Sequence, residues 1–155
     1  MTKKNEEKIV EFFQKIVGLE VSSIELGLGS FTYINFGNDL VITPDTDDKS
    51  TRGEWQIWTY MCRWKLYRDE ETVCSSIDED REELTDSLSI LKGKCLVEAM
   101  VLSETFDMVL EFDDDLYFYL ISDDGEKESE QWNLFTPERK VLVAGPGEEL
   151  SYENE

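Results

Sequence analysis

The chain has 155 residues and a formal net charge of −21, which arises from 36 acidic and 15 basic residues. This charge excludes general binding to DNA or RNA and adhesion to an anionic membrane surface, because the phosphate groups of either would repel the chain. The sequence has no histidine, which excludes histidine-based catalytic triads, zinc sites with histidine ligands and histidine pH switches. Hydrophobic residues make up 40% of the chain, enough to build the core of one domain.

The first predicted element is an amphipathic helix over residues 4–17. Its apolar side chains recur at the spacing i, i+3, i+4, i+7 and i+8 from Ile9 to Val17, which places them on one face, and Gly18 supplies a stop. The charged N-terminus does not lead into the apolar core of a secretory signal, and no segment reaches the roughly 18 apolar residues that span a bilayer. We therefore expect a cytoplasmic protein without a membrane partner.

Beyond Leu19 the apolar residues follow a period of two, and short runs rich in β-branched and aromatic residues are separated by Gly, Asn and Asp. This pattern predicts antiparallel hairpins. The longest predicted strand covers residues 54–67, where the alternation puts Trp58 and Trp64 on one face, which we assign to the core. Trp55 falls on the other face, and we expect it to be an exposed anchor in an interface.

A short helix is predicted between residues 78 and 93, because Leu84, Leu88 and Leu91 recur at helical spacing behind an acidic start. More short strands follow before a Gly-Pro-Gly sequence at residues 145–147. These strands are expected at residues 95–102, 107–112, 116–122, 131–136 and 140–144.

Together these elements predict an α+β fold. The N-terminal helix and one inserted helix would pack on one face of a curved, mainly antiparallel sheet. We expect residues 1–147 to form a single domain, and residues 148–155 to form an acidic, flexible tail.

The negative charge is concentrated in the second half of the chain, where residues 79–155 carry 22 acidic and six basic residues. Much of it lies in predicted turns, and acidic turns on neighbouring hairpins could form one docking surface for a cationic protein, with an aromatic side chain as an apolar anchor. The alternative interpretation is a solvated surface whose charge keeps the protein soluble. The predicted partner-binding residues are Asp113, Asp114, Asp115, Asp123, Asp124, Glu126, Glu128, Trp55, Tyr117 and Tyr119.

Motifs for other chemistry are incomplete. The acidic stretch at residues 45–50 lacks the glycine and the glutamate of an EF-hand, and the chain has neither a phosphate-binding G-K-[ST] motif nor a G-x-S-x-G nucleophile motif. The three cysteines include no C-x-x-C pair, and we expect reduced core thiols. We therefore predict no catalytic residue, no metal and no cofactor; an enzyme that uses carboxylates, with or without a metal, is an alternative.

Two segments resemble a small, largely uncharacterised bacterial domain family. The sequence EWQIWTYMCRWKL at residues 54–66 is similar to its central strand, which ends in W-[RK]-[LI], and EQWNLF at residues 130–135, followed by VLV at residues 141–143, is similar to its closing E-x-W-x-L-F signature. Its members resemble small cytosolic proteins, and some of them are similar to immunity proteins, the antitoxins of polymorphic toxin systems.

The resemblance implies a cytosolic, non-enzymatic protein. Together with the charge, it predicts a protein that binds a basic toxin domain, such as a nuclease, and blocks its substrate site. We expect a monomer or a weak dimer. The alternative is a small protein-binding or scaffolding domain whose charge serves solubility.

Overall fold

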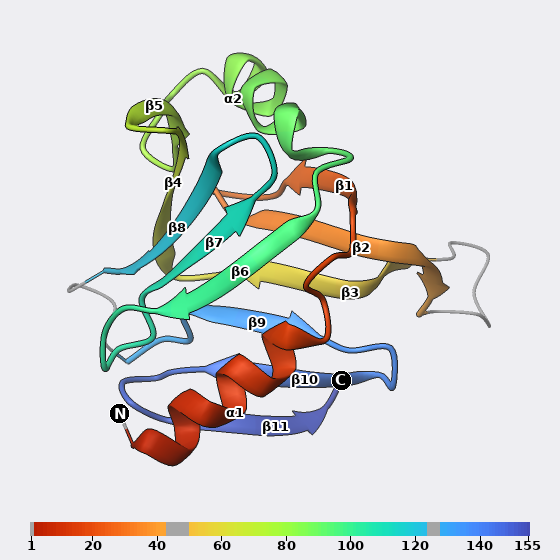
Figure 1. Ribbon diagram of the computed structural model, residues 1–155, viewed down its shortest axis with the longest axis vertical. Helices are drawn as coiled ribbons and strands as arrows, with labels where there is room; N and C mark the ends of the chain where they lie inside the picture. Colours follow the sequence, from red (N-terminus) through yellow and green to blue (C-terminus); the bar gives the residue numbers. More distant parts are fainter. Residues whose placement is uncertain (1, 43–49, 124–127) are drawn as a thin grey trace.

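The structure is a computed structural model that describes residues 2–42, 50–123 and 128–155 (Figure 1). Within these residues the chain forms two α-helices, one 3-10 helix and eleven strands, and all strand pairings are antiparallel. This confirms the predicted α+β fold with an N-terminal helix and an inserted helix. The predictions for Asp124 and Glu126, and those for most of the acidic stretch at residues 45–50, lie outside the described residues.

The strands form two sheets, where the sequence predicted one. The first sheet has six strands in the order β1-β2-β3-β9-β10-β11. The second has five strands in the order β5-β4-β8-β7-β6. Their bounds are Val21–Leu26 for β1, Thr32–Val41 for β2, Thr51–Thr59 for β3, Cys62–Arg68 for β4, Glu71–Ser75 for β5, Leu96–Val101 for β6, Met108–Phe112 for β7, Leu116–Ser122 for β8, Trp132–Phe135 for β9, Lys140–Ala144 for β10 and Leu150–Asn154 for β11.

The long strand predicted at residues 54–67 is wrong, because it divides into β3 and β4, which belong to different sheets. In β3 the odd-numbered Ile57 is buried, whereas in β4 the even-numbered Trp64 and Leu66 are buried. Side chains on one regular strand alternate between its faces, so residues 57 and 64 could not both face the core without an interruption. The break at residues 60–61 therefore lets both sets of side chains enter one core.

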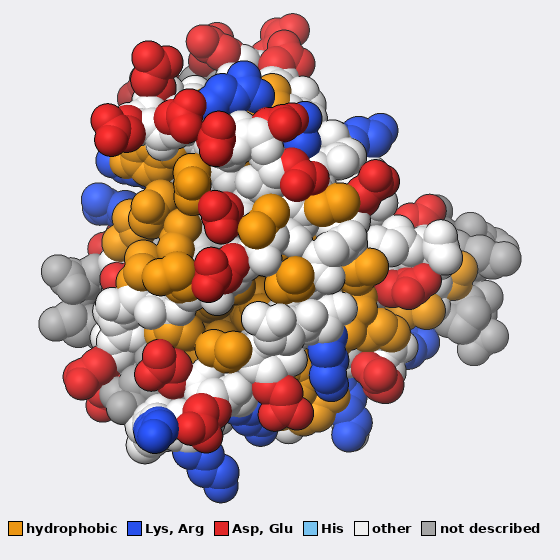
Figure 2. Space-filling view, viewed as in Figure 1, with side chains coloured by type: hydrophobic (Ala, Val, Ile, Leu, Met, Phe, Trp, Pro, Cys, Tyr) orange, Lys and Arg blue, Asp and Glu red, His pale blue; other side chains and the backbone are white. Residues whose placement is uncertain are grey.

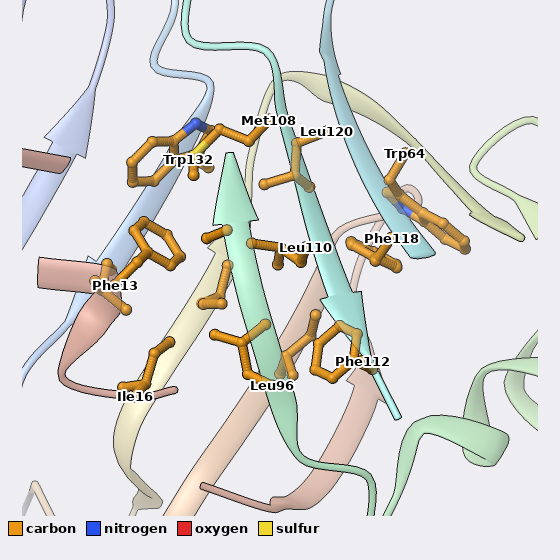
Figure 3. Close-up of a cluster of buried hydrophobic side chains, with 14 of the residues drawn as sticks. Phe13, Ile16, Trp64, Leu96, Met108, Leu110, Phe112, Phe118, Leu120 and Trp132 are labelled. Carbon is orange, nitrogen blue, oxygen red and sulfur yellow. The ribbon is translucent and has the colours of Figure 1, made fainter. Parts of the chain in front are cut away.

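The two sheets enclose this core. The ring of Phe36 in β2 stacks on that of Phe112 in β7, with centroids 6.4 Å apart and planes 8° from parallel. Figure 3 shows the neighbouring side chains of β7 and β8, among them Leu110 and Phe118, in the same buried cluster. Trp64 stacks on Phe118 with centroids 5.5 Å apart and is fully buried, which confirms its predicted place in the core.

The helix α1 (Lys3–Gln14) buries the predicted apolar stripe. Its N-cap is Thr2, whose hydroxyl accepts a hydrogen bond from the Asn5 N–H at 3.1 Å. Phe13 meets Trp132 of β9 edge-on, with centroids 5.5 Å apart, and Phe12 packs against Tyr152 of β11. The helix also contacts β6, so it closes one open side of the core between the two sheets.

The inserted helix α2 (Arg81–Leu88) continues into the 3-10 helix η1 (Ser89–Leu91). Asp80 caps it by accepting a hydrogen bond from the Glu83 N–H, and the predicted leucine stripe is buried. The helix contacts β5 and β1, at the opposite end of the molecule from α1 (Figure 1). The expectation that both helices share one face of a sheet is therefore wrong: each closes a different side of the two-sheet core.

The flexible tail predicted at residues 148–155 is also wrong. Residues 150–154 form β11, which pairs with β10 in full register. Leu150 and Tyr152 pack against the core, and the carboxylate of Glu155 lies 3.0 Å from the buried guanidinium of Arg52. The acidic composition of this segment concealed a strand whose apolar side chains alternate with polar ones.

Candidate protein-binding surface

The outer face of the five-stranded sheet is the candidate surface. Along β4, β8 and β7, the side chains between the buried ones point away from the core. Figure 2 shows apolar side chains gathered on this face, with carboxylates among them. The pairing of the strands arranges the outward side chains in two adjacent rows. The first row consists of Glu98, Glu111, Tyr117 and Tyr67, and the second of Met100, Val109, Tyr119 and Lys65.

Tyrosines dominate the centre of this face. The rings of Tyr67 and Tyr119 meet nearly at a right angle, with centroids 5.4 Å apart. The hydroxyl of Tyr117 donates a hydrogen bond to the Glu111 carboxylate at 3.3 Å. The charge of Glu111 is the main reason that the pKa of Tyr117 is raised above its ordinary value, and Asp115 and Asp69 add to the effect. The surface around the tyrosines is therefore negatively charged.

Two acidic turns meet at one end of this face. Asp69 and Glu70 form the β4–β5 turn, Glu71 is the first residue of β5, and the β7–β8 turn carries the predicted aspartates at residues 113–115. The Asp69 N–H donates a hydrogen bond to the Asp115 carbonyl oxygen at 2.8 Å, which joins the turns directly. The first turn was not predictable as part of this surface, because only the register of β4 against β8 brings these distant segments together.

The second predicted turn lies elsewhere. Asp123 follows β8, whereas Asp115 precedes it, so the eight residue steps between them separate them by about 26 Å at roughly 3.3 Å per residue. Asp123 forms an ion pair with Arg63 at 3.4 Å, and Glu128 lies farther along the same connection. The turn at residues 113–115 and Asp123 therefore lie at opposite ends of β8, so the structure does not bring Asp123 next to this turn as predicted.

The three aspartates of the β7–β8 turn differ in their contacts. The Asp113 carboxylate accepts a hydrogen bond from the Cys95 N–H at 2.9 Å, which ties the turn to the start of β6. Asp114 pairs with Lys94, and this hydrogen bond and charge lower the pKa of Asp114. Within the described chain, Asp115 has no ion-pair partner, so its charge is fully available to solvent or to a bound protein.

Two tryptophans, Trp55 and Trp58, do not lie where the sequence predicted. Trp55 is buried opposite Phe36 on the core side of the six-stranded sheet, so the prediction that it is an exposed anchor is wrong. Trp58, which we assigned to the core, is half-buried on the outer face of that sheet between Tyr33 and Phe135. Both errors follow from the change of face between β3 and β4. The predicted anchors Tyr117 and Tyr119 do lie on an outer face.

The thiols are not activated. Cys62, Cys74 and Cys95 are free, and burial raises the pKa of Cys62 and of Cys74 to about 12. In the ranges that the structure describes, no three acidic or cysteine side chains are grouped so that they could hold a metal ion. No helix of the described segments has the length and apolar character needed to cross a membrane.

Comparison of the chain with models of protein families, with curated proteins and with solved structures found no match. The resemblance to immunity proteins therefore stays a prediction. The function has to be argued from the tyrosine face and the two acidic turns beside it.

Proposed function

We propose that the chain is a non-enzymatic, cytoplasmic immunity protein that binds a basic toxin domain through the outer face of the five-stranded sheet. One observation carries this proposal: the acidic turns at residues 69–71 and 113–115 meet beside a face of outward tyrosines. We call the tyrosine rows and these two turns the acidic tyrosine face.

The composition of this face suits a protein interface. Tyrosine is enriched at binding hot spots, because its ring buries apolar area and its hydroxyl still forms hydrogen bonds. Met100 and Ile121 remain 48% and 36% exposed, so apolar area is available for burial by a partner. The surrounding carboxylates supply the polar rim that interfaces usually have.

The charge suits a cationic partner. A negatively charged surface accelerates the encounter with a basic protein and disfavours acidic competitors. A nuclease needs a positively charged substrate site to hold phosphates. An acidic inhibitor can therefore occupy such a site in place of nucleic acid. The raised pKa of two of the thiols argues against a thiolate reaction and so favours binding over catalysis.

A second candidate function is protein binding or scaffolding in which the charge serves only solubility. It is favoured by the many carboxylates that lie far from the tyrosines, such as Glu79, which precedes α2, and Glu82, which lies on α2. It is also favoured by the ion pair that partly neutralises Asp114. Under this candidate, the partner need not be basic.

Growth rescue tests the proposal. The chain is co-expressed with a basic toxin domain encoded by an adjacent reading frame, and we expect growth to be restored. The triple variant Asp69→Asn, Glu70→Gln and Asp115→Asn should rescue poorly. A matched variant that removes three exposed charges elsewhere, at Glu7, Glu11 and Glu82, should rescue normally. If neither the unchanged chain nor the matched variant restores growth, the proposed function is contradicted.

A further inference from the structure

The acidic tyrosine face contains a small hollow. It has a volume of about 440 Å³ and is lined by Tyr67, Asp69, Glu70, Tyr119 and Ile121. Two aromatic rings, two carboxylates and one aliphatic side chain thus converge on one small space. Elsewhere on the face, Tyr117 lies beside Glu111, and Val109 lies beside Met100.

The rings are held in place by the sheet. Tyr67 and Tyr119 are diagonal neighbours on β4 and β8, since Tyr67 pairs with Tyr117 and Lys65 pairs with Tyr119. The residues next to them in sequence, Leu66 and Phe118, are fully buried and fix the backbone on both strands. The rings meet nearly edge to face, with planes 80° apart, and so form a corner beside the carboxylates. A bound group would stack on one of the rings without a rearrangement of the strands.

The charge of the hollow is negative. Asp69 is held in the left-handed region with φ of 53°, where it forms the turn that leads to Glu70. Among the described residues, the cation–π contacts of the chain's own lysines and arginines involve Tyr152, Phe12 and Phe135, and none involves Tyr67 or Tyr119. The lining of the hollow therefore combines two carboxylates with two aromatic rings, and Lys65, the cross-strand neighbour of Tyr119, lies beside the hollow without lining it.

We infer that this hollow binds the guanidinium group of an arginine side chain of the partner. The inference deepens the proposed function, because it names the chemical group through which a basic protein would be recognised. A guanidinium stacks on aromatic faces and donates hydrogen bonds to carboxylates at the same time. An ammonium is more strongly hydrated and cannot stack as a plane, so arginine fits the corner better than lysine does. A neutral side chain would leave the two carboxylates without a counter-charge.

The inference can be tested on the chain alone, without a toxin. The probe is N-acetyl-arginine N-methylamide, titrated into the full chain while the ring resonances of Tyr67 and Tyr119 are followed by NMR. The citrulline analogue has nearly the same shape without the charge, and the lysine analogue has the charge without the plane. We expect saturable shifts with arginine and binding about fivefold weaker with either analogue, because citrulline lacks the charge and the lysine ammonium is more strongly hydrated and cannot stack as a plane.

Variants locate the site. Tyr119→Leu, and the pair Asp69→Asn with Glu70→Gln, should each weaken binding of the arginine probe about fivefold. The matched controls are Tyr33→Leu on the outer face of the six-stranded sheet and the pair Glu7→Gln with Glu11→Gln on α1, none of which belongs to the acidic tyrosine face, and both should bind normally. Circular dichroism spectra verify that each variant is folded.

Equal binding of arginine and citrulline, binding of lysine as tight as arginine, or equal loss in the control variants would overturn the inference. These outcomes are distinct from failure of the proposed function. If growth rescue fails while the arginine probe binds at Tyr67 and Tyr119, the immunity function is wrong and the guanidinium site stands. If growth rescue depends on the acidic turns but the arginine probe does not bind, the guanidinium site is wrong and the immunity function stands.

Discussion

Replacing Trp132 by phenylalanine should destabilise the protein far more than the same replacement of Trp58. Trp132 is fully buried, and its indole N–H donates a hydrogen bond to the Phe106 carbonyl oxygen at 2.9 Å. That carbonyl belongs to a residue with φ of 66°, a backbone conformation that L-residues rarely adopt. The indole nitrogen of Trp58 has no hydrogen-bond partner in the part of the chain that the structure describes.

The magnitude follows from these contacts. Trp132→Phe leaves a buried carbonyl without its donor, which costs about 1–3 kcal/mol, and the smaller ring leaves a cavity that costs about 1 kcal/mol more. We therefore expect a loss of about 3 kcal/mol and a melting temperature lower by about 6–12 °C for a chain of this length. Trp58→Phe removes a buried donor that had no partner, which offsets the lost contact area, and we expect a change below about 1 kcal/mol.

The assay is urea unfolding followed by far-UV circular dichroism, so that the loss of a tryptophan does not alter the signal itself. The two variants are compared at the same pH and protein concentration. The slope of the free energy of unfolding against urea concentration must agree between them for the urea midpoints to be compared. A loss of stability for Trp58→Phe equal to or larger than that for Trp132→Phe would refute the reasoning, because the hydrogen bond would then not decide the difference.

Three further predictions test the ends of the strands and the thiols. Removal of residues 150–155 should lower the melting temperature by several degrees, because β11 packs on α1; an unchanged melting temperature would mean that these residues contribute nothing. Asp113→Ala should lower the melting temperature by about 2–4 °C through the lost hydrogen bond to the Cys95 N–H, whereas Asp115→Asn should leave it unchanged. The pKa of Cys62 and of Cys74 is raised from 9.0 to about 12 in the folded chain, so the stability that these neutral thiols contribute is present below pH 9 and is lost as the pH rises from 9 towards 12. Replacing both cysteines by alanine should flatten the dependence of the urea midpoint on pH between 8 and 11, and an equally steep dependence would contradict this assignment.

Local signals in the sequence predicted the helices well. The apolar stripe from Ile9 to Ile16 has a helical period that no strand can match, and its residues are buried as expected. The acidic start before Leu84 is the cap of α2. Both elements were predictable because the evidence for each lies within about a dozen residues of sequence.

The division of the long β segment was not predictable from the same kind of evidence. Residues 54–67 carry large apolar side chains at both odd and even positions, so alternation does not show which face is buried. The buried face changes between Ile57 and Trp64 because the chain passes from one sheet to the other there. Nothing in the segment itself, such as a glycine or a proline, marks that passage. The misplacement of Trp55 and Trp58 follows directly from it.

The candidate surface was only partly predictable. Alternation along β8 correctly placed Tyr117 and Tyr119 outside the core. The acidic turn that meets residues 113–115, however, is fixed by hydrogen bonds between β4 and β8, which are separated by about fifty residues in sequence. Strand register over such distances depends on the packing of the whole core, so the sequence alone did not show that residues 69–71 lie next to residues 113–115.

The central claim is that the acidic tyrosine face binds a cationic protein. The most direct test is the association rate constant with a basic toxin domain, measured over a range of salt concentrations. For the unchanged chain, and for the variant that lacks the charges of Glu7, Glu11 and Glu82, we expect rapid association that slows steeply as salt is added. For the variant Asp69→Asn, Glu70→Gln and Asp115→Asn, we expect slower association and a clearly shallower dependence on salt. The same rate and the same dependence on salt in both charge variants would contradict the claim.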